Sequence, residues 1–223
     1  TIRFMVIYCL ISNCTTNACF VKWNKKKMTR LRQSVNFKKN HFEHEAWKKG
    51  GYVVGIDEVG RGCLAGPLVT AAVILPLHKP HRCLKDSKLI NVKEREKAYL
   101  WIINNCAFQI GIVHNRLIDQ QNIWHATITC MKKALINLLS QPGIPEPDAL
   151  VVDAMPLKLS DTGLTLPVYH FPKGERKSSS IAAASIIAKV TRDRLMNEYE
   201  RLFPGYLLAQ HKGYSTGFHK KII

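Results

Sequence analysis

Four acidic side chains stand where they could hold metal ions, and they are Asp57, Glu58, Asp153 and Asp193. Asp57 is the last residue of an apolar, β-branched run at 52–57, and Glu58 follows it. Asp153 directly follows the apolar run 150–152. Ligand sets made only of oxygens favour Mg²⁺ or Mn²⁺ over Zn²⁺. Two such ions can activate a water molecule and stabilise the leaving oxygen of a phosphodiester. The pattern therefore indicates metal-assisted phosphodiester hydrolysis.

The position of Asp193 strengthens this interpretation without settling it. Asp193 follows Ile186 and Val190 at helical spacing, so all three share one helix face. A carboxylate on the sheet-facing stripe of a helix is costly to bury alone. An aspartate between two arginines is, however, also typical of a surface ion pair, and an aspartate at a strand end is commonly a turn former. Spacing alone leaves both interpretations open.

A glycine-rich segment surrounds the first acid pair, in the stretch GIDEVGRGCLAG at 55–66. Gly55 and Gly60 flank the acids and indicate tight backbone packing on both sides. The Gly60-Arg61-Gly62 triplet is by itself typical of a plain turn. Because glycines let a backbone approach a ligand closely, the same triplet beside two acids also suits a binding loop.

Strand and helix patterns alternate along the part of the chain that must position these residues. Apolar, largely β-branched runs predict strands at 52–57, 68–75, 108–113, 150–152 and 168–171. Helices are predicted at 91–104, at 116–139, and from a serine cap at 178–180 to about 202. Asn91 is the expected N-cap of the first helix. This order predicts an α/β fold, a mixed sheet with helices packed on it.

The charge of the chain points to a polyanionic partner. The 33 Lys and Arg residues exceed the 16 Asp and Glu residues, for a formal net charge of +17. Such a field attracts nucleic acid, although some soluble proteins are basic without binding it. Residues 22–50 are rich in lysine and arginine and have no sustained periodicity. We therefore expect residues 1–50 to be a flexible basic extension and residues 51–223 to be one catalytic domain.

The seven cysteines include no Cys-x-x-Cys pair, which favours a reducing compartment, and we expect a cytoplasmic protein. The apolar run 4–11 is too short to span a membrane and is at best a weak signal-peptide candidate. No segment of the chain is apolar over the 18 consecutive residues that would indicate a membrane-spanning helix. We therefore expect no membrane association.

Five segments together resemble bacterial ribonuclease HII, over about residues 52–219. They are GIDEVGRGCLAGPL at 55–68, DSK at 86–88, Asp119-x-x-Asn122-Ile123, SIAAASIIAKVTRDRLM at 180–196 and HKGYST at 211–216. The resemblance implies the ribonuclease H-like α/β fold, a mixed sheet flanked by helices with a small C-terminal helical and loop extension.

The resemblance also implies a role for each residue that matches a family motif. The catalytic, metal-binding carboxylates are Asp57, Glu58, Asp153 and Asp193. The triplet Gly60, Arg61 and Gly62 reads the 2′-hydroxyl of a ribonucleotide. Tyr214 packs on the sugar of the neighbouring deoxynucleotide at an RNA–DNA junction. Expected phosphate contacts are Lys88, Asn122, Lys189 and Arg192. His211 and His219 receive no catalytic role.

The activity implied is that of an endoribonuclease dependent on Mg²⁺ or Mn²⁺, with two ions during catalysis. Such an enzyme hydrolyses the RNA strand of RNA–DNA hybrids and cuts on the 5′ side of ribonucleotides embedded in duplex DNA. It leaves a 3′-hydroxyl and a 5′-phosphate, as ribonucleotide excision repair requires. We expect a monomer whose partners are these two kinds of duplex.

The chain departs from the family pattern at three places. Ala154 stands where the family usually has glycine, and Glu175 stands where it usually has aspartate. The family normally continues beyond HKGYST, so we expect the last part of the substrate-contacting region to be missing. Two alternatives remain, a ribonuclease HIII and a non-catalytic nucleic-acid binder. The aspartate at position 193 and the short arm argue against the first, and the four acids argue against the second.

Overall fold

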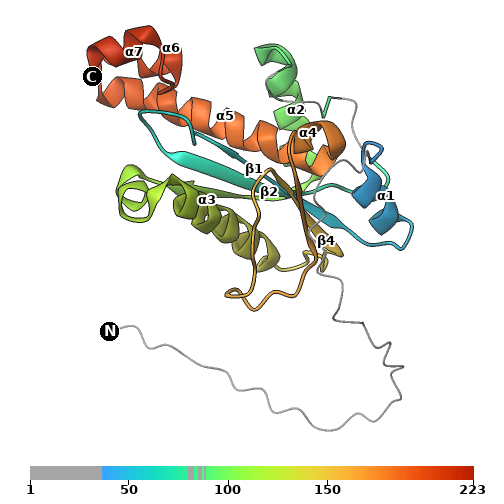
Figure 1. Cartoon of the computed structure of the whole chain (residues 1–223). Coiled ribbons are helices and arrows are strands. Elements are labelled where there is room, and N and C mark those ends of the chain that lie inside the picture. Colours follow the sequence, from blue (N-terminus) through green and yellow to red (C-terminus); the bar gives the residue numbers. More distant parts are fainter. Residues whose placement is uncertain (1–36, 80–82, 85–86, 88) are drawn as a thin grey trace, which may run out of the picture. The chain divides into compact units, whose positions relative to one another are not determined.

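The computed structural model describes residues 37–79, 83, 84, 87 and 89–223 (Figure 1). These residues pack as one unit that begins at Phe37. Lys88, an expected phosphate contact, lies outside the described residues. Among the described helices, none is both long and apolar enough to cross a membrane.

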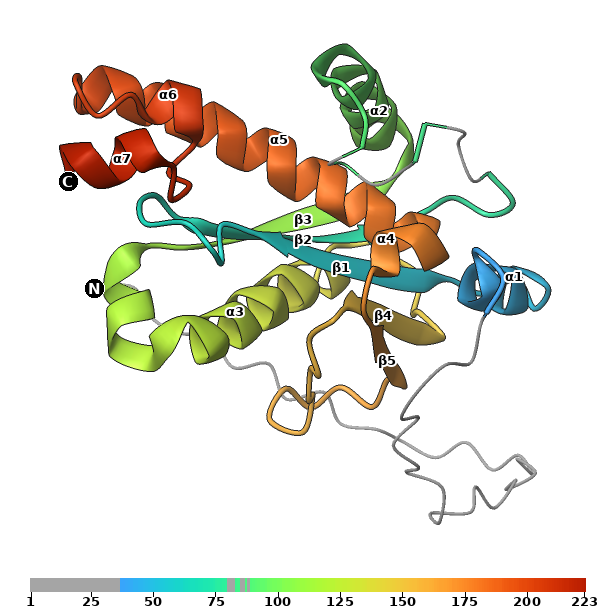
Figure 2. The same cartoon turned by 45° about the horizontal axis from the view of Figure 1, so that its top comes forward.

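A five-stranded mixed sheet forms the centre of this unit, in the order β3-β2-β1-β4-β5 (Figure 2). The strands are β1 Val53–Val59, β2 Leu68–Ile74, β3 Ala107–Val113, β4 Ala149–Asp153 and β5 Val168–Phe171. β1, β2 and β3 pair antiparallel, whereas β1 pairs parallel to β4 and β4 pairs parallel to β5. All five predicted strands are present, with ends that move by no more than two residues. The expected α/β mixed sheet is confirmed.

Helices cover both faces of the sheet (Figure 2). α2 Val92–Asn105 and α5 Ser179–Leu202 lie on one face, where the alanine-rich part of α5 packs on alternate residues of β2. α3 Asn115–Leu139 lies on the other face and packs on β1, β2 and β4. Successive strand residues point to opposite faces. The sheet therefore separates an α5 side from an α3 side.

The long helices begin as their capping residues predict. Asn91 forms a capping box with Glu94 at the start of α2, and the Ser178 hydroxyl accepts a hydrogen bond from the Ile181 N–H at the start of α5. α3 differs from the expected single helix, because Asn122 has a non-helical backbone with φ 61° and ψ 165°. The helix is therefore two segments joined at Asn122.

Four short helices complete the unit, and the sequence patterns predicted none of them by its bounds. They are α1 His41–Trp47, α4 Gly174–Lys177, α6 Leu208–His211 and α7 Gly217–Ile222. α6 and α7 form the small C-terminal extension expected from the resemblance (Figure 1).

α1 corrects the expected domain boundary at residue 50. Its Trp47 is buried in the main core, and its Glu43 carboxylate accepts hydrogen bonds from the Ser178 hydroxyl and the Ser180 N–H. Asn40, just before α1, accepts from the Ser179 N–H. The residues before β1 thus cap the first turn of α5, and the packed unit begins at Phe37 rather than at residue 51. The basic composition of residues 22–50 concealed this short amphipathic helix.

β1 and α5 make a close backbone contact between layers. A Cβ added at Gly55 would be 2.1 Å from the Ser180 carbonyl carbon, and one added at Gly60 would be 2.6 Å from Arg192 Nε. Both glycines therefore permit a contact that a side chain would prevent. From Gly55 to Gly60 the strand advances alongside α5 from Ser180 to Arg192, so β1 and α5 run in the same direction.

Candidate active site

Two of the four acids, Asp57 and Asp153, lie side by side at the ends of neighbouring strands. β1 and β4 are parallel, and their register pairs Ile56 with Val152. The next residue on each strand is an aspartate, and both face the α5 side because the preceding pair packs on α3. Strand order and register thus bring together two carboxylates that are 96 positions apart in the chain.

Asp57 is a buried carboxylate with two other carboxylates nearby. Only 6% of it is exposed, and it has a side-chain hydrogen bond with Ser185 of α5. Burial raises the pKa of Asp57 well above its usual value, and the charges of Glu58 and Asp153 raise it further. Asp57 is therefore close enough to both neighbouring carboxylates to be repelled by them. Ser185 in turn contacts the Ser87 hydroxyl, with 2.8 Å between the oxygens.

Glu58 follows Asp57 in the strand and therefore points toward the α3 side. Its Oε1 lies 3.8 Å from an Arg61 guanidinium nitrogen. The same guanidinium stands over the indole of Trp124, with 5.2 Å between its carbon and the ring centroid. Arg61 thus connects the second acid of the pair to α3.

Asp153 is held by the backbone of α4. Its Oδ1 accepts a hydrogen bond of 2.7 Å from the Gly174 N–H, the first residue of that helix. A Cβ at Gly174 would be 2.7 Å from Ile181 Cδ1 and 3.1 Å from Asp153 Oδ1, so the close approach requires glycine. The residue after Asp153, Ala154, has a φ of 52°. Alanine is strained in this left-handed region, which glycine adopts without a steric cost.

Asp193 lies further along α5 and has a different partner. It is two helical turns beyond Ser185, or about 12 Å along the axis at 1.5 Å per residue. Its Oδ1 accepts a hydrogen bond of 2.8 Å from Lys189 Nζ. Burial lowers the pKa of Lys212, and the charge of Asp193 opposes that shift, so Lys212 is also close. Burial raises the pKa of the Cys63 thiol and the charge of Asp193 adds to that shift, so Asp193 lies near the residue that follows the 60–62 loop.

The donor set fits divalent cations by its chemistry. Within residues 37–223, apart from the gaps noted above, no three Asp, Glu, His or Cys side chains stand ready-made as a metal site. Burial and the charges of Glu58 and Asp153 nevertheless raise the pKa of Asp57, and a bound cation would favour its ionised form instead. Because every donor is a carboxylate oxygen, Mg²⁺ or Mn²⁺ suits the set.

The Gly60-Arg61-Gly62 loop begins where β1 ends, next to the acids. Gly60 has φ 104° and touches Arg192, so its glycine is required by the fold. Gly62 differs, because a Cβ there would meet nothing within 4 Å among the described residues. The fold does not account for a glycine at 62, whereas a ligand that approaches the backbone would.

Tyr214 lies against this loop although it is 152 positions after Gly62 in the chain. It forms an isolated antiparallel bridge with Cys63, and the Leu64 N–H donates to the Gly213 carbonyl at 2.9 Å. Tyr214 is 38% exposed, and Lys189 Nζ lies 5.3 Å from its ring centroid. The structure thus places a partly exposed aromatic face beside the glycine loop.

His211 and His219 hold the turn that carries Tyr214. Their rings stack with 4.0 Å between centroids. His219 Nδ1 lies 2.9 Å from the Tyr214 carbonyl oxygen, and the Gly213 N–H donates to His211 Nδ1. Both histidines are buried. They support the loop structurally, through contacts with the backbone of Tyr206, Gly213 and Tyr214.

The expected phosphate contact of Arg192 is wrong. Its side chain is fully buried. Its guanidinium donates to three backbone carbonyls, at 2.8 Å to Pro67, 2.6 Å to Lys212 and 2.9 Å to Ala65. A side chain enclosed in this way cannot reach a phosphate. It ties α5 to the segment after the glycine loop and to the turn of Tyr214.

The other two described phosphate candidates stay predictions. Lys189 is partly exposed and sits between Asp193 and Tyr214. Asn122 is exposed, but its Oδ1 accepts hydrogen bonds from the Trp124 and His125 N–H groups and so caps the second segment of α3. Each of these side chains thus has a contact within the protein.

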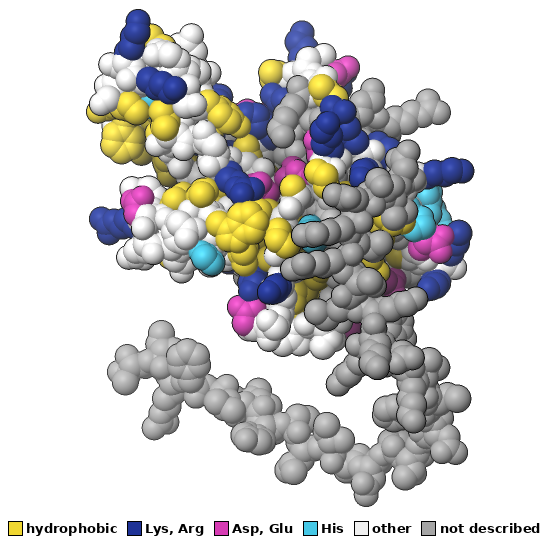
Figure 3. All heavy atoms as spheres, in the orientation of Figure 1, with side chains coloured by type: hydrophobic (Ala, Val, Ile, Leu, Met, Phe, Trp, Pro, Cys, Tyr) yellow, Lys and Arg dark blue, Asp and Glu magenta, His cyan; other side chains and the backbone are white. Residues whose placement is uncertain are grey.

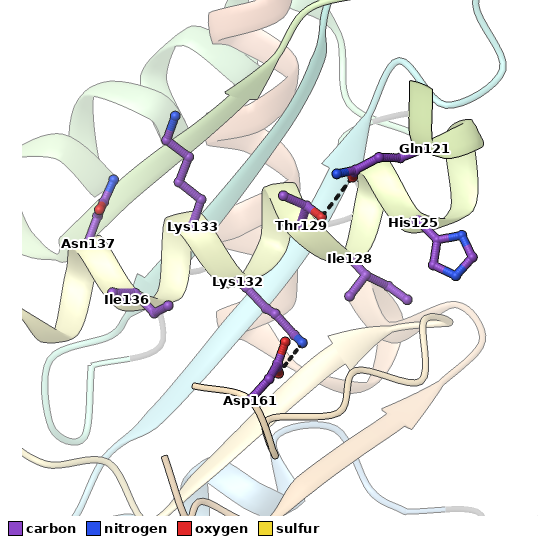
Figure 4. A pocket seen from close by; sticks show the side chains of 9 residues that line it. All are labelled: Gln121, His125, Ile128, Thr129, Lys132, Lys133, Ile136, Asn137 and Asp161. Carbon is purple, nitrogen blue, oxygen red and sulfur yellow. Dashed lines mark hydrogen bonds and ion pairs between the residues drawn. The ribbon is translucent and has the colours of Figure 1, made fainter. Parts of the chain in front are cut away.

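The surface beside these residues is hollowed. Figure 3 shows a recess between the part that carries α6 and α7 and the part that carries the start of α3, with acidic side chains near the middle of this face and basic ones close by. A different groove, of about 740 Å³, runs along α3 from Gln121 to Asn137 (Figure 4). It contains the Lys132–Asp161 ion pair and none of the four acids, so it is not the candidate active site.

Sequence reasoning missed Ser185 and Trp124. Ser185 precedes Lys189 by four residues and Asp193 by eight, so its helical spacing could have placed it on the same face. No comparable signal pointed to Trp124, because its contact with Arg61 joins segments 63 positions apart.

Replacing the strained alanine after Asp153 should stabilise the protein. Ala154→Gly removes a left-handed backbone strain of about 1–2 kcal/mol. Part of this gain is lost because glycine increases the conformational entropy of the unfolded chain. We expect a net gain of about 0.5–1 kcal/mol in the free energy of unfolding, measured by urea denaturation. Ala98→Gly, inside α2, is the control and should cost about 1 kcal/mol. A loss of stability in Ala154→Gly would contradict the assigned strain.

Removing the buried charge should stabilise the metal-free protein. The folded-state pKa of Asp57 is raised, so its contribution is complete below the unfolded-state pKa of about 3.9 and is lost as pH rises through the folded-state pKa. In EDTA at pH 7, Asp57→Asn should therefore unfold with at least about 1 kcal/mol more free energy than the parent. The free energy of unfolding of Asp57→Asn should also fall less between pH 4 and neutrality than that of the parent.

The matched control is Asp161→Asn, because the pKa of Asp161 is lowered by its hydrogen bond with Lys132. That change should not stabilise the protein at neutral pH. Adding Mg²⁺ or Mn²⁺ should raise the thermal midpoint of the parent more than that of Asp57→Asn. Equal shifts in the two proteins would separate Asp57 from metal binding.

Known proteins resemble this chain in sequence and in fold. A family model described as Ribonuclease HII matches residues 54–223. The Ribonuclease HII of Enterococcus faecalis is 45% identical over 201 residues, which cover 89% of this chain and 75% of that protein. Among solved structures, the ribonuclease HII of Archaeoglobus fulgidus, in complex with PCNA, superposes with a TM-score of 0.62 at 26% identity, covering 77% of this chain and 86% of that one.

A second solved structure shares the fold and contains a metal. It is Bst-RNase HIII in complex with Mn²⁺, with a TM-score of 0.60 and 25% identity, covering 70% of this chain and 57% of that one. The family model, however, is that of type HII, and it spans the acids, the glycine loop and Tyr214. The chain therefore belongs to the ribonuclease HII family, the type 2 ribonucleases H.

Proposed function

We propose that this chain is an endoribonuclease that cuts on the 5′ side of a ribonucleotide embedded in duplex DNA and leaves a 3′-hydroxyl and a 5′-phosphate. Membership of the ribonuclease HII family supports the coarser activity, hydrolysis of RNA paired with DNA. The observation that carries the finer proposal is the adjacency of three coupled carboxylates to a loop with an open backbone at Gly62.

The carboxylates are the chemical part of this proposal. Asp57 and Asp153 face the α5 side together, Glu58 points to the α3 side, and Asp193 lies two helical turns beyond Ser185 on α5. These four side chains would hold divalent cations, Mg²⁺ or Mn²⁺, at the scissile phosphate. Two bound cations would supply an activated water and stabilise the leaving 3′-oxygen. Ser185 and the Gly174 N–H orient two of the acids by hydrogen bonds.

The glycine loop would select the sugar. The backbone at Gly62 can approach a ribose because no side chain stands there and no described protein atom fills the space. A hydrogen bond to the 2′-hydroxyl is the contact that distinguishes RNA from DNA at one nucleotide. Because the loop directly follows the acid pair, sugar reading and hydrolysis can occur at the same nucleotide.

Tyr214 would read the next sugar. Its partly exposed ring lies on the same side as the loop backbone, held there by the bridge to Cys63. A flat aromatic face packs well against a deoxyribose, and a 2′-hydroxyl on that sugar would crowd it. Lys189, above the ring, adds a positive charge near the backbone of the duplex. This pair favours a junction at which a ribonucleotide is followed by a deoxynucleotide.

The decisive measurement is cleavage of a DNA duplex that contains one ribonucleotide. The chain should cut it in Mg²⁺ or Mn²⁺ and not in EDTA, and the ends of the products should be a 3′-hydroxyl and a 5′-phosphate. Asp57→Asn should lower the cleavage rate by at least about 100-fold while the duplex still binds. Cleavage of equal rate in EDTA would contradict metal-assisted hydrolysis, and a cut on the 3′ side would contradict the assigned geometry.

Tyr214→Ala should alter substrate preference. We expect cleavage of the single embedded ribonucleotide to fall about tenfold more than cleavage of a continuous RNA–DNA hybrid, as stacking contacts of about 1–3 kcal/mol allow. The ratio of the two rates is measured at fixed salt, because duplex affinity depends on salt. Tyr206→Ala, an exposed tyrosine near the same end of the molecule, is the control and should leave the ratio unchanged. Equal losses on both substrates would make Tyr214 a packing residue only.

A further inference from the structure

Two exposed aromatic side chains flank the glycine loop, and only Tyr214 has a part in the function proposed above. Tyr214 reaches the loop from the α5 side, where Lys189 lies over its ring. Trp124 belongs to α3, which covers the opposite face of the sheet (Figure 2). Trp124 is 40% exposed. The loop at 60–62 therefore has an aromatic face on each side.

Trp124 is tied to the loop by Arg61. The Arg61 guanidinium carbon lies 5.2 Å from the indole centroid, within the range of a cation–π contact. One nitrogen of the same guanidinium is 3.8 Å from Glu58 Oε1. The indole is thus one side chain away from both the sugar-reading backbone and the row of acids.

The backbone of α3 is shaped so that Trp124 begins a new helical segment at this place. Asn122 has φ 61° and ψ 165°, a conformation that is otherwise almost confined to glycine. Its Oδ1 accepts hydrogen bonds from the Trp124 N–H at 3.0 Å and from the His125 N–H at 3.1 Å. These bonds hold Trp124 in the first turn of the second segment. Strained backbone of this kind concentrates at functional sites.

The chemistry of the pair matches a nucleic-acid backbone. An exposed indole offers a flat apolar face, and the adjacent guanidinium adds positive charge. A sugar presents a C–H face and the phosphate next to it carries a negative charge, in DNA and in RNA alike. A contact of this kind is independent of base sequence and of the 2′-hydroxyl.

We propose that Trp124 contacts the sugar–phosphate backbone of the duplex on the α3 side of the glycine loop, opposite Tyr214. This inference rests on the proposed function in one respect, that the 60–62 loop faces the ribonucleotide. The two aromatic residues then divide the work: Tyr214 reads which sugar follows the ribonucleotide, and Trp124 adds affinity for any duplex.

The first test measures duplex binding in EDTA, where no cleavage occurs, by fluorescence anisotropy of a labelled duplex. Trp124→Leu should bind about tenfold more weakly, by the same factor for all-DNA duplex and for duplex with one ribonucleotide. Trp124→Phe keeps an aromatic face and should recover most of the affinity. Ile136→Ala is the matched control, an apolar residue of the same helix that is also 40% exposed, and it should bind like the parent. The thermal midpoint of each variant checks its fold.

The second test uses the indole itself as the probe. Adding unlabelled duplex should quench the tryptophan emission of the parent, and the quenched part should be missing from Trp124→Leu. The contact is overturned if Trp124→Leu binds within twofold of the parent, or if its emission responds to duplex as strongly as that of the parent. It is also overturned if the loss of affinity is confined to the ribonucleotide-containing duplex.

These outcomes are separable from the proposed function. If the parent cuts the ribonucleotide-containing duplex while Trp124→Leu binds and responds like the parent, the proposed function stands and the contact fails. If the parent cuts no substrate but its Trp124 emission is quenched by duplex, the contact stands and the proposed function fails.

Discussion

The direct contact of α5 with the backbone of β1 is the constraint on which the rest of the site depends. Gly55 lets the first turn of the helix reach the strand, and Gly60 leaves room for Arg192 about three turns later. Between these points Ser185 meets Asp57. A Cβ at either glycine would force the two elements apart, and every side chain that α5 contributes would move with it. The helix is also held at its first turn by Glu43 and Asn40 from before β1.

Charge is distributed unevenly between the surface and the site. The chain carries a formal net charge of +17, yet the end of β1 gathers carboxylates in a place where burial and mutual repulsion raise the pKa of Asp57. Without a bound cation, the folded protein therefore disfavours the ionised form of Asp57, which is the form that a cation would bind. The general positive field attracts a polyanion, and the local negative site gives a divalent cation a reason to bind where the phosphate would arrive.

Arg192 illustrates how a cation can serve the site without touching a ligand. Its three hydrogen bonds to carbonyls join α5, the segment after the glycine loop and the turn of Tyr214. Ala65 and Pro67 lie 127 and 125 positions before Arg192 in the chain, so this one side chain joins segments that are distant in sequence. A planar guanidinium supplies several donors in a fixed arrangement, which a lysine could not replace. The relative position of Gly62 and Tyr214 thus depends on this buried side chain together with the bridge between Cys63 and Tyr214.

The sequence by itself determined the strands, the three long helices and the two caps at Asn91 and Ser178, because apolar periodicity and capping are local properties of the chain. Motif resemblance added the family, which the family model and a relative at 45% identity confirm. Only the tertiary structure decided that Arg192 is internal, that α1 belongs to the packed unit, and that Trp124 meets Arg61. Each of these depends on contacts between residues far apart in the chain, and the register and layer packing that create such contacts leave no periodic trace in the sequence.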